Sequence, residues 1–271
     1  AEFKQLYAMR PDCNVNHFAG RHVVPASQIF ARCVSHGPGG TPLDFRSDMR
    51  ETAAQMAQLR SMLDTLAKTT PGGAVFFLPS FSFLETIIPA PGRRIGGREV
   101  FAESREKGRD GLLEKFSAAV RRDGGAVLLA VSAAKLSEGI DFKDELCRLV
   151  AVVGLPYPNA SDLALIERMK FLDARRERGV PGLSGREFYM ARCMKAVNQC
   201  VGRSIRHAQD WAAVLLLDRR YTQPNVHGAV SLWLREQATA ATFQETQQSL
   251  GAFFSARSAA AAAESTCGLE K

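Results

Sequence analysis

Four short runs of apolar residues constrain the fold of this chain more than any other feature. They comprise residues 74–78, 126–131, 149–153 and 213–217. Each run is rich in residues that favour β-strands, and none alternates apolar with polar side chains. Strands without alternation are buried on both faces, which is typical of a parallel sheet covered by helices.

Helical periodicity lies between these runs. Apolar side chains recur at three- and four-residue steps, and a Pro-Gly-Gly sequence follows the first such segment. We expect helices over residues 47–69, 110–122, 161–172 and 186–207, with Ser161 as the N-cap of the third. Strands that alternate with helices predict an open α/β sheet, whose binding sites lie beyond the C-terminal ends of its strands. Residues 90–109 are rich in Gly and Arg, which indicates an exposed basic connector.

Composition limits the classes of partner. With 271 residues, the chain is long enough for one large domain, which we place at 1–254, followed by a low-complexity tail at 255–271. A net charge of +7 suits a polyanion such as nucleic acid. We expect no membrane partner, because no apolar run approaches the roughly 18 residues that a span requires. Six scattered cysteines indicate buried thiols in a reducing compartment. We expect no metal site, although two Cys–His pairs near the N-terminus resemble a zinc pattern.

The clearest chemical signal lies in residues 199–206. On a helix, Gln199, Arg203 and Arg206 occupy positions i, i+4 and i+7 and share one stripe, while apolar residues form the opposite stripe. Two guanidiniums on a rigid element suit the negative charge of a transferring phosphoryl group. The alternative is an amphipathic helix with a solvated basic face.

Two further segments follow predicted strands. Residues 135–142 carry two carboxylates, Glu138 and Asp141, around Gly139, which allows a ligand to approach the backbone closely. Residues 79–81 place Ser80 at the start of a helix, where its hydroxyl and free N–H groups can bind a phosphate. A simple N-cap is the alternative role of Ser80.

The chain lacks the parts of a complete nucleotide site. No G-x-x-x-x-G-K-[ST] phosphate loop and no Asp-Glu-Ala-His segment occurs in the sequence. The arginines therefore need a second surface on which to act.

These motifs together resemble those of the second helicase lobe of the XPD-like iron–sulfur DNA helicases, a superfamily-two group. QCVGRSIRH at 199–207 resembles motif VI, AKLSEGIDF at 134–142 resembles motif V, and VFFLPSFSFLE at 75–85 resembles motif IV. RHVVPASQI at 21–29 and VLLLDRRY at 214–221 are similar to the ChlR type, the helicases of sister-chromatid cohesion. The resemblance implies a RecA-like α/β lobe with a central, mostly parallel sheet flanked by helices.

The resemblance also assigns roles to individual residues. Arg206 would be the arginine finger on the γ-phosphate of ATP, and Arg203 would contact the neighbouring phosphates. The other residues expected at the ATP site are Gln199, Glu138, Gly139 and Asp141. The residues expected to contact DNA are Ser80, Phe81, Lys135 and Ser137.

The cofactors implied are ATP and Mg²⁺, shared with an upstream helicase lobe that would carry the phosphate loop and the iron–sulfur cluster. We therefore expect a C-terminal part of a nuclear 5′-to-3′ DNA helicase of DNA repair and cohesion, inactive without the upstream lobe. Single-stranded or forked DNA would be the substrate. One alternative is a nucleic-acid-binding module without catalysis. Another is a small-molecule enzyme on a doubly wound sheet, which would need a Gly-rich loop after its first strand.

Overall fold

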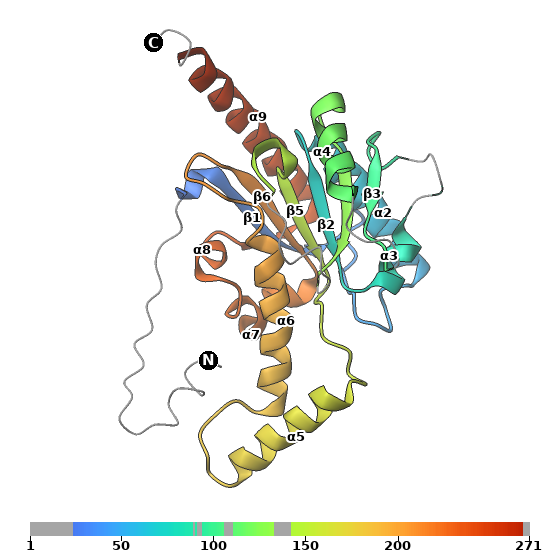
Figure 1. The fold of residues 1–271 in the computed structure, drawn as a ribbon, viewed down its shortest axis with the longest axis vertical. Coiled ribbons are helices and arrows are strands. Elements are labelled where there is room, and N and C mark those ends of the chain that lie inside the picture. The colour runs from blue at the N-terminus through green and yellow to red at the C-terminus, as the bar shows by residue number, and fades with distance from the viewer. Residues whose placement is uncertain (1–23, 89, 91–93, 106–110, 133–141, 268–271) are drawn as a thin grey trace.

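A seven-stranded parallel sheet forms the centre of the molecule (Figure 1). The structure, a computed structural model, describes residues 24–88, 90, 94–105, 111–132 and 142–267. The strand order is β3-β4-β2-β5-β6-β1-β7, and every pair of neighbours is parallel. The strands are β1 (Ile29–His36), β2 (Ala74–Leu78), β3 (Val100–Ala102), β4 (Val127–Val131), β5 (Leu149–Val153), β6 (Ala212–Leu217) and β7 (Thr239–Thr242).

The four apolar runs form the middle of this sheet, as the sequence predicts. Every residue of β2, β4, β5 and β6 is buried. Ala74 pairs with Leu149, and Leu149 pairs with Ala213, so these strands begin at nearly the same level. All their C-terminal ends therefore lie at one edge of the sheet, which we call the carboxyl edge, and their N-terminal ends lie at the opposite, amino edge.

Helices cover both faces of the sheet. Helices α2 (Ala53–Thr69), α3 (Phe81–Ile87) and α9 (Phe243–Cys267) contribute to one buried apolar cluster. Helices α4 (Leu112–Asp123), α6 (Gly185–Val201), α7 (Pro224–His227) and α8 (Leu232–Arg235) contribute to a second cluster on the other face. Short 3₁₀ helices are η1 (Ala26–Gln28), η3 (Asp144–Leu146) and η4 (Arg219–Thr222).

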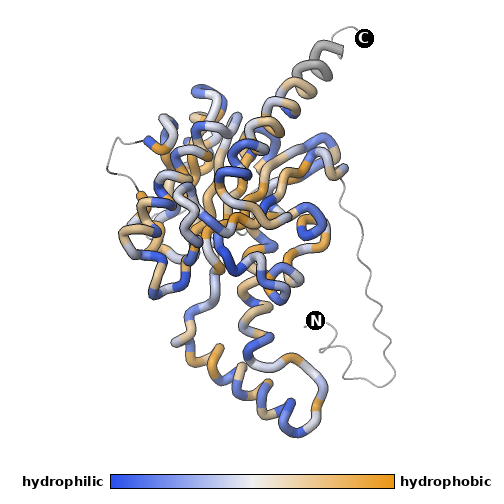
Figure 2. The backbone as a smooth tube through the Cα atoms, turned by 180° about the vertical axis from the view of Figure 1, so that it is seen from behind, coloured by the Kyte–Doolittle hydropathy of each residue, from blue (hydrophilic) through white to orange (hydrophobic). Residues whose placement is uncertain are grey.

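Helix α5 (Leu163–Glu177) lies apart from these two layers. It forms a hairpin with α6 that projects beyond the carboxyl edge of the sheet (Figure 1). The tube in Figure 2 shows hydrophobic stretches gathered along the strands, whereas α5 mixes hydrophobic and hydrophilic residues along its length. Of the residues of α5, only Leu165 and Leu172 are buried, whereas every residue of β5 is buried.

Several helix boundaries differ from the sequence-based prediction, and three of them bear on the site or the hairpin. Helix α2 begins at Ala53 and not at residue 47, because Thr52 has an extended backbone and the preceding residues form turns. The N-cap of α5 is Asp162 and not Ser161, since its carboxylate accepts from the N–H groups of Ala164 and Leu165. Helix α6 ends at Val201, six residues earlier than predicted.

The basic connector also differs from the prediction. It contains the edge strand β3, and Arg98 just before this strand donates to the carbonyl oxygens of Thr70 and Gly72. Burial lowers the pKa of this guanidinium. Gly125 has a φ of +156°, and a Cβ there would collide with Arg98. This part of the connector is thus a fixed structural element. Helix α9 runs without a break across residue 255, where the sequence analysis separates the domain from the low-complexity tail. That separation stays a prediction.

Candidate functional site

The segment 202–211, between α6 and β6, carries the two arginines of the predicted ATP site. Near the end of α6, the thiol of Cys200 donates to the carbonyl oxygen of Ser132, just beyond β4, at 3.5 Å. The segment therefore starts near the carboxyl edge of the sheet. It ends at Trp211, directly before β6, at the amino edge. We call these residues the arginine loop.

Short-range bonds explain why α6 stops at Val201. The N–H groups of Arg203 and Ser204 donate to the carbonyls of Cys200 and Val201, which tightens the last turn. The buried hydroxyl of Ser204 also donates to the Val201 carbonyl at 2.7 Å. The helical stripe predicted for Gln199, Arg203 and Arg206 is therefore wrong. Helical spacing continues in the sequence, but the backbone bonds end the helix first.

The three predicted residues lie in different surroundings. Gln199 is exposed on the last turn of α6, whereas Arg203 and Arg206 are half-buried in the arginine loop. The expected apolar side of the segment is confirmed, because Met194, Val197, Val201 and Ile205 are buried in the core and Met190 packs against it.

Asp210 anchors the arginine loop to the sheet. Its carboxylate accepts from Nη1 of Arg148 at 2.8 Å, from the N–H of Trp211 at 2.9 Å and from the N–H of Arg206 at 3.1 Å. The side chain of Asp210 is 1% exposed and that of Arg148 is 12% exposed. Burial raises the pKa of Asp210, even though Arg148 and the two N–H groups act in the opposite direction. The backbone of Arg206 is therefore held by a buried ion pair.

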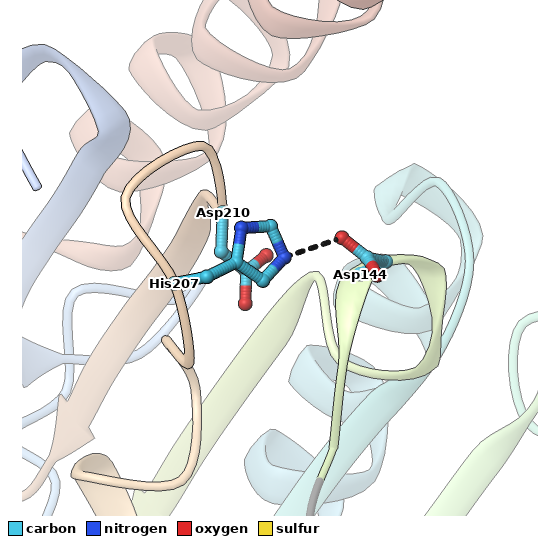
Figure 3. A group of neighbouring side chains, drawn as sticks. All are labelled: Asp144, His207 and Asp210. Atoms are coloured by element: carbon cyan, nitrogen blue, oxygen red, sulfur yellow. Dashed lines mark hydrogen bonds and ion pairs between the residues drawn. The ribbon is translucent and has the colours of Figure 1, made fainter.

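A second contact joins the arginine loop to η3. Nε2 of His207 lies 2.9 Å from a carboxylate oxygen of Asp144, and both side chains are partly exposed. Figure 3 shows the imidazole of His207 between Asp144 and Asp210, which come from separate segments of the chain. This contact ties the loop to the residues directly after the predicted motif V.

The group Asp144, His207 and Asp210 has ligand atoms within 4.8 Å of one another, a spacing that suits a metal ion. The donor set does not fit one, however. Both oxygens of Asp210 already accept from N–H groups, and the Arg148 guanidinium lies 2.8 Å from one of them. A cation there would be repelled by this guanidinium. The three side chains instead connect the arginine loop to η3 and to Arg148.

Residues 133–141, which contain all but the last residue of the predicted motif V, fall outside the described residues. This applies to Lys135, Ser137, Glu138, Gly139 and Asp141. The residues on either side of it are fixed in the fold: Ser132 donates to the carbonyl of Leu78, and Phe142 packs edge-on against Phe116 in the core. Because Asp144 contacts His207, the segment that follows motif V meets the arginine loop.

Ser80 and Phe81 lie at the carboxyl edge of the sheet. The hydroxyl of Ser80 accepts from the N–H of Phe83 at 3.2 Å, so its predicted role as an N-cap is confirmed. The ring of Phe81 is half-buried beneath the guanidinium of Arg105, at 5.2 Å. We expected all sites at the carboxyl edge, but Arg206 lies towards the amino edge, because the arginine loop runs back along the sheet.

Sequence reasoning missed Asp210 and Arg148. Arg148 directly precedes the buried apolar strand β5, and Asp210 lies two residues before the buried apolar strand β6. These two strands are neighbours in the sheet. Charges of opposite sign at the starts of adjacent parallel strands are a signal that could have paired these residues. The pairing of β5 with β6 had to be known first.

A parallel sheet with helices on both faces, carrying an arginine-bearing loop before a central strand, has the architecture of a RecA-like motor lobe. Residues 63–237 match the family model described as "Helicase C-terminal domain". This match covers more than half of the chain, so the chain belongs to the helicase C-terminal domain family.

Named relatives share this domain. The chain is 31% identical over 281 residues to "ATP-dependent DNA helicase chl1" of Aspergillus clavatus, covering 93% of this chain and 38% of that protein. It is 37% identical over 252 residues to "ATP-dependent DNA helicase chl-1" of Caenorhabditis elegans, covering 90% and 30%. The chain thus spans about a third of the length of these relatives.

A solved XPD helicase structure has the same fold. It superimposes with a TM-score of 0.57 at 19% identity, over 79% of this chain and 35% of that one. At this identity the likeness establishes the fold alone. No described helix is long and apolar enough to cross a membrane.

Proposed function

We propose that this chain is the second motor lobe of an ATP-dependent DNA helicase. The family match and the names of the relatives support this proposal. The observation that carries it is the arginine loop, in which the backbone of Arg206 is held by the buried Asp210–Arg148 pair. A rigid base is what a residue needs if it must reach across a cleft to a phosphate with fixed geometry.

ATP would lie between this lobe and an upstream lobe. Arg206 would contact the γ-phosphate and Arg203 the phosphates beside it, with Gln199, Glu138, Gly139 and Asp141 completing this side of the site. Two half-buried arginines fit a polyphosphate, because guanidiniums keep their charge and donate several bonds. Mg²⁺ would be held by the upstream lobe and would neutralise phosphate charge during hydrolysis.

The DNA strand would follow the carboxyl edge of the sheet. Ser80 and Phe81 lie there, and Lys135 and Ser137 belong to the segment that leaves β4 at the same edge. We propose movement 5′ to 3′ along the single strand of a forked DNA. Hydrolysis would open the cleft between the lobes and shift these backbone contacts.

The upstream lobe would also hold the iron–sulfur cluster. The described cysteines, Cys33, Cys147, Cys193 and Cys200, are buried thiols of this lobe and belong to its packing. We place the complete protein in the nucleus, in DNA repair and sister-chromatid cohesion, following the ChlR-type motifs of the sequence.

The decisive experiment measures ATP hydrolysis by the full-length protein with and without single-stranded DNA. Arg206→Ala should reduce DNA-stimulated turnover roughly 10³- to 10⁵-fold, the value of an arginine finger in related phosphoryl transfer, while DNA affinity persists. Arg192→Ala, at an exposed position on α6, is the matched control and should retain turnover.

Near-normal turnover by Arg206→Ala would contradict the proposed mechanism and make the arginine loop a solvated basic surface. Undetectable turnover by the wild-type full-length protein, with DNA binding retained, would favour a nucleic-acid-binding module without catalysis.

A further inference from the structure

Helix α5 exposes an aromatic ring among arginines. Phe171 is 51% exposed, and the guanidiniums of Arg168 and Arg175 lie 5.4 Å and 5.8 Å from its ring centre. Arg178 follows at the end of the helix, so the four residues are spaced three, four and three apart and share one side. We call these four residues the α5 outer face.

A neighbouring side of α5 makes its contacts with the rest of the fold. Leu165 and Leu172 are buried there, and the carboxylate of Asp173 accepts from the N–H of Gly185 at the start of α6. Arg168, Phe171 and Arg178 are nevertheless exposed, and Arg175 is half-buried. Packing against the rest of the fold therefore does not account for the aromatic ring of Phe171.

The acids of the hairpin do not neutralise this face. Glu167 pairs with Lys170, Glu187 pairs with Arg176, and Asp162 caps the helix. Among the described residues, no carboxylate lies within ion-pair distance of Arg168, Arg175 or Arg178. The face thus combines uncompensated positive charge with an exposed ring, the pattern by which proteins grip a single strand without reading its sequence.

The position of the hairpin agrees with this chemistry. The chain leaves β5 at the carboxyl edge and continues into α5, and β5 is the neighbour of β2, which ends at Ser80. Helices α3 and α5 accordingly lie at the same end of the sheet (Figure 1). A strand that passes Ser80 can continue outward along the hairpin.

We infer that the α5 outer face is a second binding surface for single-stranded DNA, beyond the motif residues. Arg168, Arg175 and Arg178 contact phosphates, and a base stacks on Phe171 when one guanidinium moves to a phosphate. That exchange is easy because both guanidiniums lie near the outer limit of a cation–π contact. We expect single strands to bind more tightly than duplex DNA, because the bases of a duplex are stacked on their neighbours and cannot stack on Phe171. This inference rests on the proposed function.

The test is equilibrium binding of a fluorescent oligodeoxythymidine to the full-length protein at several salt concentrations. Phe171→Ala should weaken binding by about fivefold or more, because stacking on an aromatic ring is worth roughly 1–3 kcal/mol per base. Phe171→Trp should bind as tightly as the wild type. Arg168→Glu should lower the slope of log affinity against log salt by about 0.7, the value for one phosphate contact on a single strand.

Lys68→Glu is the matched control. Lys68 is exposed on α2, which covers the other face of the sheet, and the substitution changes the charge by the same amount. It should leave both affinity and salt slope unchanged. All these positions are exposed, so the variants should fold as the wild type does, which circular dichroism would verify.

An unchanged affinity of Phe171→Ala, an unchanged salt slope of Arg168→Glu, or a Phe171→Trp variant as weak as Phe171→Ala would each overturn the inference. DNA-stimulated ATP turnover of the wild type separates the two proposals. If that turnover is present and depends on Arg206, while the α5 variants bind DNA normally, only this inference fails.

Discussion

At the scale of single residues, Asp210 holds the arginine loop in place. It joins the arginine loop to Arg148 at the start of β5 and accepts from two backbone N–H groups. Arg206 depends on this carboxylate for the position of its backbone. A residue without catalytic chemistry of its own therefore determines where the proposed arginine finger lies.

Asp210→Ala should lower the free energy of unfolding by about 3–5 kcal/mol, because it leaves the guanidinium of Arg148 buried without its counter-ion. Urea denaturation of the chain measures this change. Asp123→Ala is the control, since Asp123 pairs with an Arg122 side chain that is 64% exposed, and its loss should leave the free energy of unfolding nearly unchanged. Equal effects of the two substitutions would show that Asp210 is not an anchor.

At the scale of elements, the sequence predicted the strands better than the ends of helices. A strand buried on both faces consists of consecutive apolar residues. Residues 74–78 and 149–153 could therefore be assigned as strands directly from the sequence. The end of α6 could not, because apolar residues continue at helical spacing through Ile205. The helix ends because the hydroxyl of Ser204 donates to the backbone and because Asp210 forms an ion pair with Arg148. The two partners of that ion pair are 62 residues apart in the sequence.

The candidate site was predictable to the same limited degree. Motif spacing identified Arg203 and Arg206, but their positions depend on contacts between distant segments. Ser80 is the opposite case, because its N-cap bond to Phe83 is local and could be read from three consecutive residues. The N-cap bond of Ser80 could therefore be anticipated from the sequence, whereas the long-range ion pair between Arg148 and Asp210 could not.

The turn between α5 and α6 gives a prediction on pH. Ser184 and Glu187 form a capping box, in which the Ser184 N–H donates to the Glu187 carboxylate at 2.7 Å. This bond lowers the pKa of Glu187 from its ordinary 4.5, with smaller help from Arg176. A depressed pKa means that the ionised carboxylate stabilises the fold above pH 4.5, and this contribution is lost as the pH falls through the folded-state pKa.

Between pH 6 and pH 3, the thermal midpoint of the wild type should therefore fall more than that of Glu187→Gln. Glutamine keeps an oxygen for the capping box but cannot titrate. Differential scanning calorimetry across this range gives the two slopes. Parallel curves for both proteins would show that Glu187 has the same pKa in the folded and unfolded states.

At the scale of the whole molecule, the sheet connects two apolar cores that lie on opposite faces. Along β2, Phe76 points into the cluster with α2, and Phe77 points into the cluster with α6. Each central strand contributes to both clusters in this way, since successive side chains of a strand point to opposite faces. Neither core can open without disturbing the strands that complete the other, so we expect the lobe to unfold as one unit.

Buried thiols can test this cooperativity. Cys33, Cys193 and Cys200 belong to the cluster with α6, and burial raises the pKa of each to about 12. At neutral pH they carry about a thousandfold less thiolate than an ordinary cysteine, so they should react with iodoacetamide only after unfolding. Ala67→Cys places a thiol in the cluster with α2, where Ala67 is fully buried.

Site-by-site labelling across a urea series, read by mass spectrometry, should then show one common transition for the thiol from Ala67→Cys and the four buried native thiols, Cys33, Cys147, Cys193 and Cys200. The background for this experiment is Cys13→Ser with Cys267→Ser, which removes the thiols outside the described core. If the thiol on the α2 side reacts at a urea concentration that leaves the four native thiols protected, the two faces open independently. The central strands would then not couple the cores, and the arginine loop, which packs Ile205 on the α6 side and Trp211 on the α2 side, would lose part of its support when the α2 side opens.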